Sequence, residues 1–309
     1  ISDYGDKLNM ELNYLFIFGA DGLARLARSL HAPSALADTL AALPLPAMGG
    51  AGAGCATMLV FWFGVLALGT HIAKNVYFRP FGLTDRFTLP RLHAQKDIAK
   101  LGWAIGLSYF LEASVFSFIV WLIADLGENY VAAQQVVISL SGVIYMIPQA
   151  VGSAATVRIG FSIGRRQFAR ARYQSGVSIA CGWLLAVCTL SFLLTCRRVL
   201  VGLYTSDAAV LDIGASLLVF AAVFQIFDFT QCIASYALRG YKLTRVPMLI
   251  HAIAFWCLGL LPGYVLNYWL HIGIYGFWSA LILSLASAAA ALVWYLEKCS
   301  RWVKQRRGL

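Results

Sequence analysis

The stretch Val210–Leu238 reads VLDIGASLLVFAAVFQIFDFTQCIASYAL, and only two of its residues, Asp212 and Asp228, carry a charge. A hydrocarbon core about 30 Å thick is crossed by roughly 20 apolar residues in helical form. Inside lipid every backbone N–H and C=O group must find a partner within the protein, which a helix provides along a single segment. This stretch therefore predicts an α-helix that spans a membrane.

Comparable apolar segments recur along the chain. Hydrophobic residues make up 60% of the sequence and charged residues 12%, against about 25% charged in a typical soluble domain. The predicted spans are residues 9–20, 48–72, 98–124, 130–157, 174–196, 209–237, 246–268 and 272–295. The first is too short to cross a bilayer, and the proline-interrupted residues 23–46 are predicted to form an external insertion. The sequence thus indicates an all-α polytopic membrane protein with about eight transmembrane helices.

The distribution of positive charge predicts the orientation of the spans. The net charge is +10, which in a soluble protein would suggest a nucleic-acid partner. Most Lys and Arg residues instead fall in four short segments that lie on one side when the spans alternate: 73–100, 158–172, 239–245 and 298–309. Because cytoplasmic loops carry an excess of Lys and Arg, these segments and both chain ends are expected to face the cytoplasm. No nucleic-acid partner is expected.

Sequence motifs for enzymatic chemistry are missing. There is no Ser/His/Asp order, no metal-ligand cluster and no nucleotide motif, and the seven cysteines form no C-x-x-C pair. The glycine run at 49–54 lacks the Lys-Ser/Thr that completes a phosphate loop, so its G-x-x-x-G spacing indicates close helix packing. We therefore expect neither an enzyme nor a cofactor, and any solute must move with an ion gradient or downhill.

Two acidic residues lie deep within predicted helices. Glu112 is the only charged residue between Lys100 and Asp125, roughly 18 Å from each. Asp228 precedes Arg239 by about 16 Å of helix. A charge at the bilayer centre costs about 2.5–3.5 kcal/mol on insertion scales, and such residues usually face a cavity on an ion or proton path. An acid buried for packing alone is the simpler alternative, and two acids at matching depth argue against it.

Polar and aromatic side chains accompany these acids at helical spacing. Hydroxyl and amide oxygens suit a hard cation such as Na⁺, and the face of an aromatic ring attracts a cation. The span at 130–157 is expected to turn Gln135 toward this polar side, whereas Trp278 is expected near a span end or on a lipid face. The sequence thus predicts a site for Na⁺ or a proton at Glu112 and Asp228. The side chains expected around it are Phe116, Tyr145, Gln225 and Gln231.

Several longer segments resemble one known family. The run Tyr130–Arg172 reads YVAAQQVVISLSGVIYMIPQAVGSAATVRIGFSIGRRQFARAR, and ALRGYKLTRVPM (237–248) and LLPGYVLNY (260–268) follow it. These segments resemble the eighth and later helices of the multidrug and toxic compound extrusion (MATE) family. LNYLFIFG (12–19) and MGGAGAGCAT (48–57) resemble its fifth and sixth helices. The resemblance covers nearly the whole chain and is closest to the NorM type of bacterial exporter.

The resemblance implies a fold, a function and site residues. MATE exporters have twelve helices in two six-helix lobes and expel cationic drugs or dyes in exchange for Na⁺ or H⁺. It implies that Glu112 and Asp228 are the acids of the C-lobe cation site, with Phe116 and Tyr145 near it. It also implies that the external loop Ser206–Asp207 meets bound drug, and that the protein is a monomer in the bacterial inner membrane.

The resemblance also divides the chain. Residues 1–78 correspond to a remnant of the N-terminal lobe, 79–97 to a cytoplasmic linker and 98–309 to a six-helix C-terminal lobe with a basic tail. The family's first four helices have no counterpart, so an N-terminally truncated exporter is expected, and residues 23–46 depart from the pattern. Drug/cation antiport is the first hypothesis. A non-transporting membrane fragment is the alternative, and export of a lipid-linked sugar is disfavoured by the acid pair at 112 and 228.

A short internal repeat accompanies these features. Leu12-Asn13-Tyr14 precedes the glycine-marked GGAG at 49–52, and Leu266-Asn267-Tyr268 precedes GIYG at 273–276. Internal repeats are common in transporters. The spacing predicts that spans one and two correspond to spans seven and eight, with a repeat unit of six helices.

Overall fold

The computed structural model describes residues 2–29, 38–39, 42, 46–82 and 92–307, and these residues form helices and short turns. The chain divides into two compact units, Ile1–Pro90 and Arg91–Leu309. The division falls within the predicted linker 79–97, and the assignment of the two parts to N- and C-terminal lobes remains a prediction.

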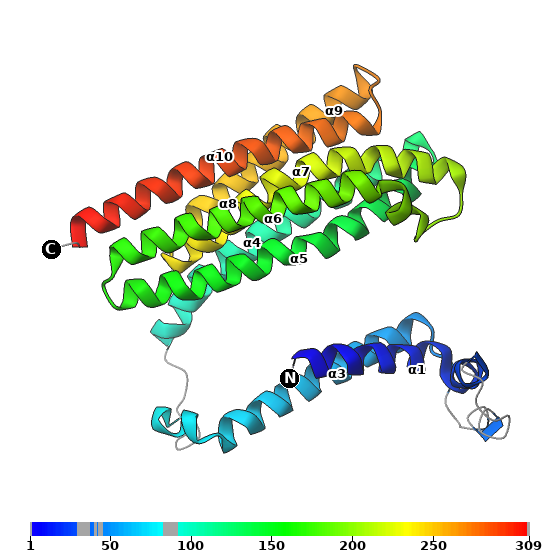
Figure 1. Ribbon diagram of the computed structural model, residues 1–309, viewed down its shortest axis with the longest axis horizontal. Helices are drawn as coiled ribbons and strands as arrows, with labels where there is room; N and C mark the ends of the chain where they lie inside the picture. Colours follow the sequence, from blue (N-terminus) through cyan, green and yellow to red (C-terminus); the bar gives the residue numbers. More distant parts are fainter. Residues whose placement is uncertain (1, 30–37, 40–41, 43–45, 83–91, 308–309) are drawn as a thin grey trace. The chain divides into compact units, whose positions relative to one another are not determined.

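The first unit is a helical hairpin followed by a short 3₁₀ helix. It contains α1 (Ser2–Ser29), α3 (Gly50–Lys74) and the 3₁₀ helix η1 (Val76–Phe81), and α1 packs against α3 (Figure 1). The first predicted span, residues 9–20, lies within α1. Residues 23–29 of the predicted insertion continue this helix, and most of residues 30–46 lie outside the described part of the chain.

Helix α1 is bent at Gly19, whose φ of 63° and ψ of −158° are not helical. The bend releases backbone carbonyls that a straight helix would use internally. The carbonyls of Phe16 and Ile17 instead accept from the N–H groups of Met48 and Gly49, at 2.9 and 3.3 Å. Glycine suits this position because it has no Cβ to oppose a positive φ. The bend therefore ties the middle of α1 to the start of α3.

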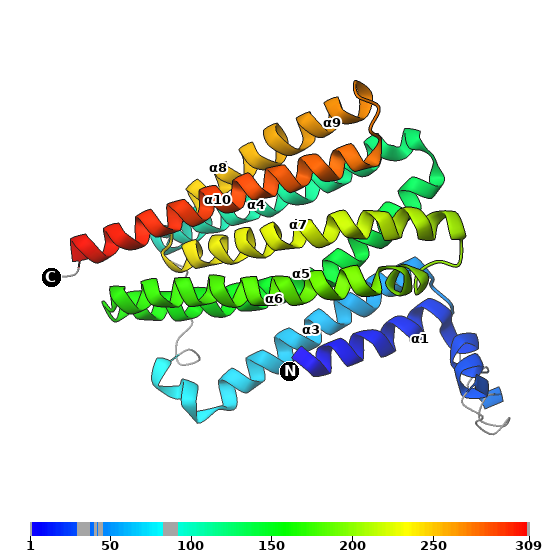
Figure 2. The same cartoon turned by 45° about the horizontal axis from the view of Figure 1, so that its top comes forward.

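The second unit is a bundle of long helices lying side by side (Figures 1 and 2). Seven helices of the described residues, one in the first unit and six in the second, are long and apolar enough to span a membrane. They match the predicted spans from 48–72 onward, which confirms the polytopic all-α fold, whereas α1 is not among them. The elements of the second unit are α4 (Leu92–Ile123), η2 (Ala124–Leu126), α5 (Glu128–Gly164), α6 (Phe168–Gly202), α7 (Ala208–Gly240), α8 (Arg245–Ala252), η3 (Ile253–Leu260), α9 (Leu261–Tyr268) and α10 (Ile274–Arg307).

Helix α7 is the centre of this bundle and packs against α5, α6 and α10. Its many alanines and glycines bring neighbouring backbones close, as is typical of helix contacts in lipid. A Cβ added at Gly240 would lie 3.0 Å from side-chain atoms of Ile159 on α5, and one at Gly152 would lie 2.8 Å from the ring of Tyr236. The stretch Val210–Leu238 thus belongs to a core helix with few lipid-facing positions.

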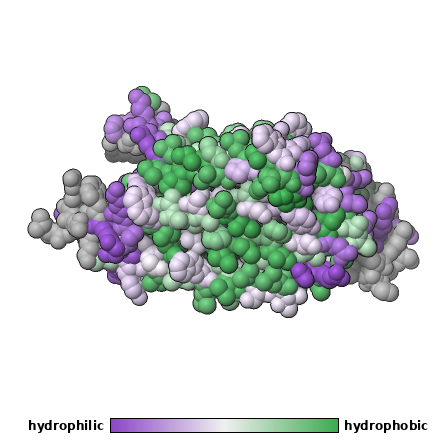
Figure 3. Space-filling model, turned by 90° about the horizontal axis from the view of Figure 1, so that it is seen from above, coloured by the Kyte–Doolittle hydropathy of each residue, from purple (hydrophilic) through white to green (hydrophobic). Residues whose placement is uncertain are grey.

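The outer helices expose large hydrophobic side chains. Trp103, Phe161, Leu184 and Trp294 are each at least 60% exposed. Figure 3 shows hydrophobic residues over much of the visible face, with hydrophilic ones gathered toward the ends. A water-soluble protein rarely leaves so much apolar surface uncovered. The surface therefore agrees with a bilayer as the surrounding medium.

The predicted span at 246–268 is not a uniform helix. Its middle, Ile253–Leu260, is a π-helix between α8 and α9. Pro262 is the second residue after it, and its missing N–H and its ring oppose regular α-helical bonding in the preceding turn. The hydroxyl of Ser284 on α10 donates to the carbonyl of Ala254 at 2.6 Å. That bond gives the irregular backbone a partner from a neighbouring helix, as irregular structure in lipid requires.

The internal repeat is visible in the turns of the two hairpins. Gly49 and Gly273 both have positive φ, 53° and 71°. Each accepts a hydrogen bond from the glycine three residues later, Gly52 at 3.1 Å and Gly276 at 3.0 Å. A Cβ at either of these later glycines would lie within 3.0 Å of the preceding helix. The two hairpins therefore share a turn and a close helix contact, in agreement with the predicted correspondence.

Candidate cation site

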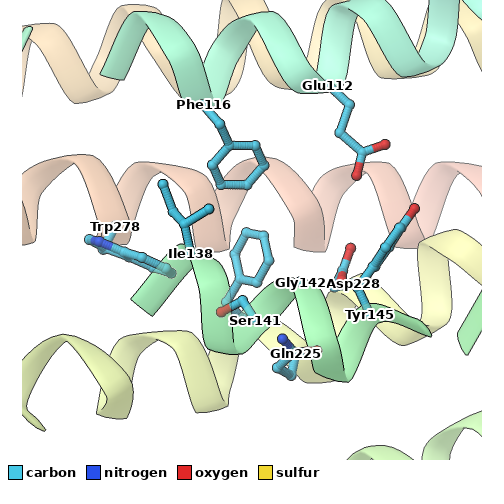
Figure 4. Close-up of a pocket in the computed structure, with 10 residues that line it drawn as sticks. Glu112, Phe116, Ile138, Ser141, Gly142, Tyr145, Gln225, Asp228 and Trp278 are labelled. Carbon is cyan, nitrogen blue, oxygen red and sulfur yellow. The ribbon is translucent and has the colours of Figure 1, made fainter. Parts of the chain in front are cut away.

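A cavity of about 150 Å³ opens within the second unit. Four long helices line it, α4, α5, α7 and α10, and Figure 4 shows their side chains converging on it. Five of the six residues predicted for the cation site, all except Gln231, are among the lining residues, together with polar and aromatic side chains that were not predicted. The lining residues are Glu112, Phe116, Ile138, Ser141, Gly142, Tyr145, Phe224, Gln225, Asp228 and Trp278.

The two predicted acids face this cavity from opposite walls. Glu112 extends from α4 toward Asp228 on α7 and the hydroxyl of Tyr145 on α5 (Figure 4). Asp228 is 4% exposed and accepts a hydrogen bond from the amide of Gln231 at 3.1 Å. Neither carboxylate takes part in an ion pair among the described side chains, whose pairs are Arg172–Glu297, Arg198–Asp212 and Arg301–Glu297.

Neutral polar atoms without partners surround the acids. Among the described residues, the amide oxygen and nitrogen of the fully buried Gln225 find no hydrogen-bond partner, and neither does the hydroxyl of Ser141. Buried polar atoms nearly always have a partner, so such a group next to a cavity indicates a bound ion, solute or water. Gln231 does not line the cavity itself but holds Asp228, and its own carbonyl oxygen is unpaired.

Aromatic rings form one end of the cavity. Phe116 and Phe224 meet edge to face at 6.2 Å between ring centroids, and Phe224 meets Trp278 in the same way at 5.7 Å. The indole N–H of Trp278 donates to the side-chain oxygen of Gln134 at 2.9 Å. Trp278 is 1% exposed, so it does not lie on a lipid face, although it is near the start of α10 as expected. Its partner Gln134 fixes the ring inside the bundle.

The glutamine predicted on the polar face of α5 is displaced by one residue. Gln134, not Gln135, is fully buried, and Gln135 is exposed. The cavity receives Ser141, Gly142 and Tyr145, which lie three and four positions apart on one helical face. One residue corresponds to about 100° of rotation, so a small error in choosing the buried face exchanges neighbouring residues. Tyr145 was correctly placed at the polar side because it lies at the centre of that face.

A second polar cluster lies beyond Glu112, toward the end of α7. A small chamber of about 10 Å³ is lined by Glu112 and Tyr145 and also by Arg239 and His251. The Arg239 guanidinium donates to the hydroxyl of Tyr109 at 3.1 Å. It also lies 4.2 Å above the ring of Tyr236, whose hydroxyl is 2.7 Å from that of Tyr109. His251 is 3% exposed and neither ring nitrogen has a partner. From its place in the sequence Arg239 was expected to be a loop cation, and this cluster was not predicted.

The predicted drug-contacting residues lie elsewhere. Asp207 is the N-cap of α7, and its carboxylate accepts from the N–H groups of Ala209 and Val210 at 2.8 and 3.4 Å. Ser206 precedes it and is exposed. At 1.5 Å per helical residue, Asp207 is roughly 30 Å from Asp228 along the same helix. The cap gives this acid a structural role, and its contact with drug stays a prediction.

The chemistry of the donors favours a hard cation. The atoms available in the cavity are carboxylate, amide and hydroxyl oxygens from residues such as Glu112, Asp228, Gln225 and Ser141. Hard cations prefer such oxygen ligands. Within the described part of the chain, no three His, Cys, Asp or Glu side chains form a group suited to a metal ion. The site is therefore built around two carboxylates and neutral oxygens, which suits Na⁺ or a proton.

Curated relatives carry multidrug resistance names. The probable multidrug resistance protein NorM of Neisseria meningitidis serogroup B is 60% identical over 294 residues. The probable multidrug resistance protein NorM of Chromobacterium violaceum is 42% identical over 298 residues. Each alignment takes 95% of this chain and 59% of the relative. The chain thus spans about three-fifths of the length of the curated relatives it matches.

Solved structures and a family comparison agree with this result. The outward-facing conformation of a multidrug resistance MATE family transporter of the MOP superfamily has a TM-score of 0.80. It is 17% identical, and the match covers 97% of this chain and 61% of that one, which shows the shared fold. The MatE family model matches residues 104–265, more than half of the chain and the part that contains both cavity acids. On these grounds the chain belongs to the MATE family.

Proposed function

We propose that this chain forms the cation-coupled part of a secondary active multidrug exporter, which antiports cationic drugs against Na⁺ or H⁺. The observation that carries the proposal is the pair Glu112 and Asp228, which share one intramembrane cavity and form no ion pair with a described cation. Ionisable residues inside membrane helices are costly and mark ion or proton paths. The proposed coupling ion binds between these two carboxylates.

A bound cation would relieve an electrostatic conflict. Two carboxylates in one poorly solvated cavity repel each other, and each has lost part of its hydration. Na⁺ or a proton removes much of that cost, and the unpaired oxygens of Gln225 and Ser141 are placed to complete the coordination of Na⁺. Phe116 would lie against the cation with its ring face. Tyr145 would contact it through the hydroxyl.

The helix contacts suggest how binding could be coupled to a change of shape. Glu112 lies on α4, which packs mainly on α8 and the π segment η3, whereas Asp228 lies on the central helix α7. A cation held by both carboxylates favours the arrangement in which α4 and α7 approach each other. A ligand can shift an equilibrium only through different affinities for its two states. Drug binding that favours the other arrangement would give antiport.

The proposed substrates and location follow from the relatives and the surface. NorM and MdtK relatives are named multidrug resistance proteins, which supports cationic amphipathic drugs or dyes as substrates. Asp207, with Ser206 beside it, is proposed to meet the drug's positive charge. The protein is proposed to be a multi-pass monomer of the bacterial inner membrane that acts as a transporter rather than an enzyme.

A non-transporting membrane fragment is the second candidate. The observation that favours it is the length of the match, because the chain covers 59% of its curated relatives. Proteoliposomes that contain the chain by itself distinguish the two candidates. Ion-driven dye export by this chain supports an independent transporter, whereas export only when the preceding part of the Neisseria relative is fused to it supports a partial unit.

The fused protein also tests the cation site. Efflux of a cationic dye is measured in proteoliposomes under an imposed Na⁺ or pH gradient, with Glu112→Gln and Asp228→Asn compared with the parent. Each change should reduce gradient-driven efflux at least tenfold while the protein still inserts and folds. Asp212→Asn is the matched control, because Asp212 lies on the same helix, is exposed and pairs with Arg198. Parent-like efflux by either cavity variant would place the coupling site elsewhere.

A further inference from the structure

A second cavity with very different chemistry lies at the other end of α7 from Asp207, where α7 turns into α8. It measures about 500 Å³, and its lining residues are Lys100, Leu101, Lys242, Leu243, Thr244, Arg245, Val246 and Tyr295. They come from α4, the turn between α7 and α8, the start of α8, and α10. The described lining residues include three cations and no carboxylate. This cavity shares no residue with the cation site.

The turn between α7 and α8 presents several anion-binding groups together. Lys242 has a φ of 61° and is held in the left-handed region by turn hydrogen bonds, including Lys242 N–H to the Arg239 carbonyl at 2.8 Å. Helix α8 begins at Arg245, so its first N–H groups have no acceptor within the helix. A helix N-terminus with free N–H groups and a positive dipole end binds anions. Pro247, one of the first residues, removes one of these donors but leaves those of Arg245 and Val246.

Thr244 supplies an independent indication of a ligand. The residue lines the cavity and is 6% exposed, and its hydroxyl does not cap α8. Threonine at an N-cap position normally uses its hydroxyl to accept from the helix. Thr244 lines a cationic cavity and its hydroxyl makes no such bond, so the hydroxyl has a donor proton available for a bound anion.

The walls of the cavity indicate an anion attached to a hydrocarbon chain. Leu101, Leu243 and Val246 alternate with the cations along its lining. Lys100 and Lys242 belong to the positively charged segments that the positive-inside rule predicts to lie at the cytoplasmic surface. Basic pockets between membrane helices at that level bind anionic lipid headgroups.

We propose that this cavity binds the phosphate of an anionic phospholipid from the cytoplasmic leaflet. The phosphate lies between Lys242 and Arg245, receives hydrogen bonds from the first N–H groups of α8 and from the Thr244 hydroxyl, and the acyl chains follow the apolar lining. Arg245 can hold two phosphate oxygens at once through its planar guanidinium. The site does not depend on the proposed transport function.

The test measures lipid binding by the purified chain in detergent. The unfolding midpoint and the number of lipids retained in native mass spectrometry are recorded with phosphatidylglycerol, with phosphatidylcholine of the same chains, and with inorganic phosphate. Phosphatidylglycerol should be retained preferentially and raise the midpoint. Arg245→Gln and Lys242→Asn should each lower its apparent affinity about fivefold. Asparagine is chosen at 242 because it tolerates the left-handed backbone.

Two further variants distinguish a specific binding site from a nonspecific effect of positive surface charge. Thr244→Val preserves volume and removes the hydroxyl. It should weaken the binding of phosphatidylglycerol about twofold without changing the binding of phosphatidylcholine. Arg165→Gln is the control, because Arg165 lies in another positively charged turn, stacks on Phe161 and does not line the cavity. Equal binding of the two lipids, or an equal loss in Arg165→Gln, would overturn the proposal. Equal stabilisation by inorganic phosphate would replace the lipid by a free anion and also overturn it.

Discussion

The membrane helices of the second unit hold acids in two contrasting settings. Glu297 on α10 lies between two arginines, and one of its oxygens accepts from Arg172 at 2.5 Å and from Arg301 at 2.7 Å. Glu112 and Asp228 share a cavity in which no described cation forms an ion pair with them. Glu297 joins α10 to α6, whereas Asp228 accepts from Gln231 on its own helix and neither cavity acid forms an ion pair with a described side chain.

The two settings contribute differently to the stability of the fold. The Glu297 side chain is 41% exposed, so its pairs are screened and add little stability. Asp228 is 4% exposed, so its charge is expensive to bury and lowers stability unless it is compensated. An acid that stabilises the fold is paired in place. An acid that costs stability is retained for a ligand, which is a common trade-off at functional sites.

The largest effect is expected from supplying the cavity with its own cation. In Ser141→Lys, an ammonium group would lie beside Glu112 and Asp228 and occupy the place of the coupling ion. Stabilisation of the purified protein by Na⁺, followed as the shift of the unfolding midpoint, should fall at least tenfold in apparent affinity. Ser139→Lys, on a different face of α5, is the control. If Ser141→Lys kept parent-like stabilisation by Na⁺, the cation would bind at another place.

Neutralising the cavity acids should have a smaller effect, which is a rise in the free energy of unfolding rather than a loss of cation affinity. Asp228→Asn removes a buried charge and keeps the shape, so the free energy of unfolding should stay equal or rise by about 1–2 kcal/mol. Glu112→Gln should behave in the same way. The measurement is unfolding in detergent with the cation absent. A loss of more than about 1 kcal/mol in both variants would mean that these acids serve the fold.

Glu297→Gln should change stability modestly and in the other direction. It weakens the links to Arg172 and Arg301, and exposed pairs of this kind contribute about 0–1 kcal/mol. The free energy of unfolding should therefore fall by less than about 1 kcal/mol, and the difference should shrink in high salt. Gradient-driven efflux should stay above half of the parent value. Loss of efflux comparable to that of Asp228→Asn would erase the distinction between the two settings.

The smallest change in stability is expected at Asp207, an acid in a third setting. Asparagine caps helices about as well as aspartate, so Asp207→Asn should leave the unfolding midpoint of the protein nearly unchanged. If Asp207 meets cationic drug, resistance to cationic compounds should drop two- to threefold in cells, while stabilisation by Na⁺ is kept. Asp207→Ala removes both the cap and the charge, whereas Asp207→Asn removes only the charge. Comparing the two variants separates the capping role from the drug contact. Unchanged resistance to every cationic compound would remove Asp207 from the drug path.

The sequence located both cavity acids because single charges stand out in apolar helices. Glu112 and Asp228 were identified from depth alone, and their convergence on one cavity follows from the fold. The faces of long helices were harder to assign. Helix α5 is 37 residues long and contains Pro148, so a register error of one residue exchanged Gln134 for Gln135. Long-range partners of this kind are set by packing rather than by local pattern.

Two other features had no signal in a single sequence. Trp278 could equally have been a membrane-interface residue, and only its bond to Gln134 on another helix decides its position. Arg239 stands at the end of a span, where positive charge is common, so its hydrogen bond to Tyr109 on α4 could not be distinguished from the setting of an ordinary cytoplasmic cation. Both residues acquire their roles from segments more than a hundred residues away or from tertiary geometry.

The π segment Ile253–Leu260 has a consequence for alignment. A π-helix advances less along its axis per residue than an α-helix, so the segment stores extra chain between two fixed ends. A relative with a regular α-helix here can connect the same ends with a shorter chain. A gap placed by sequence matching within 253–260 would then mark a change of helix type rather than a lost loop. Residues on the two sides of the segment should accordingly be aligned as separate blocks, each with its own register.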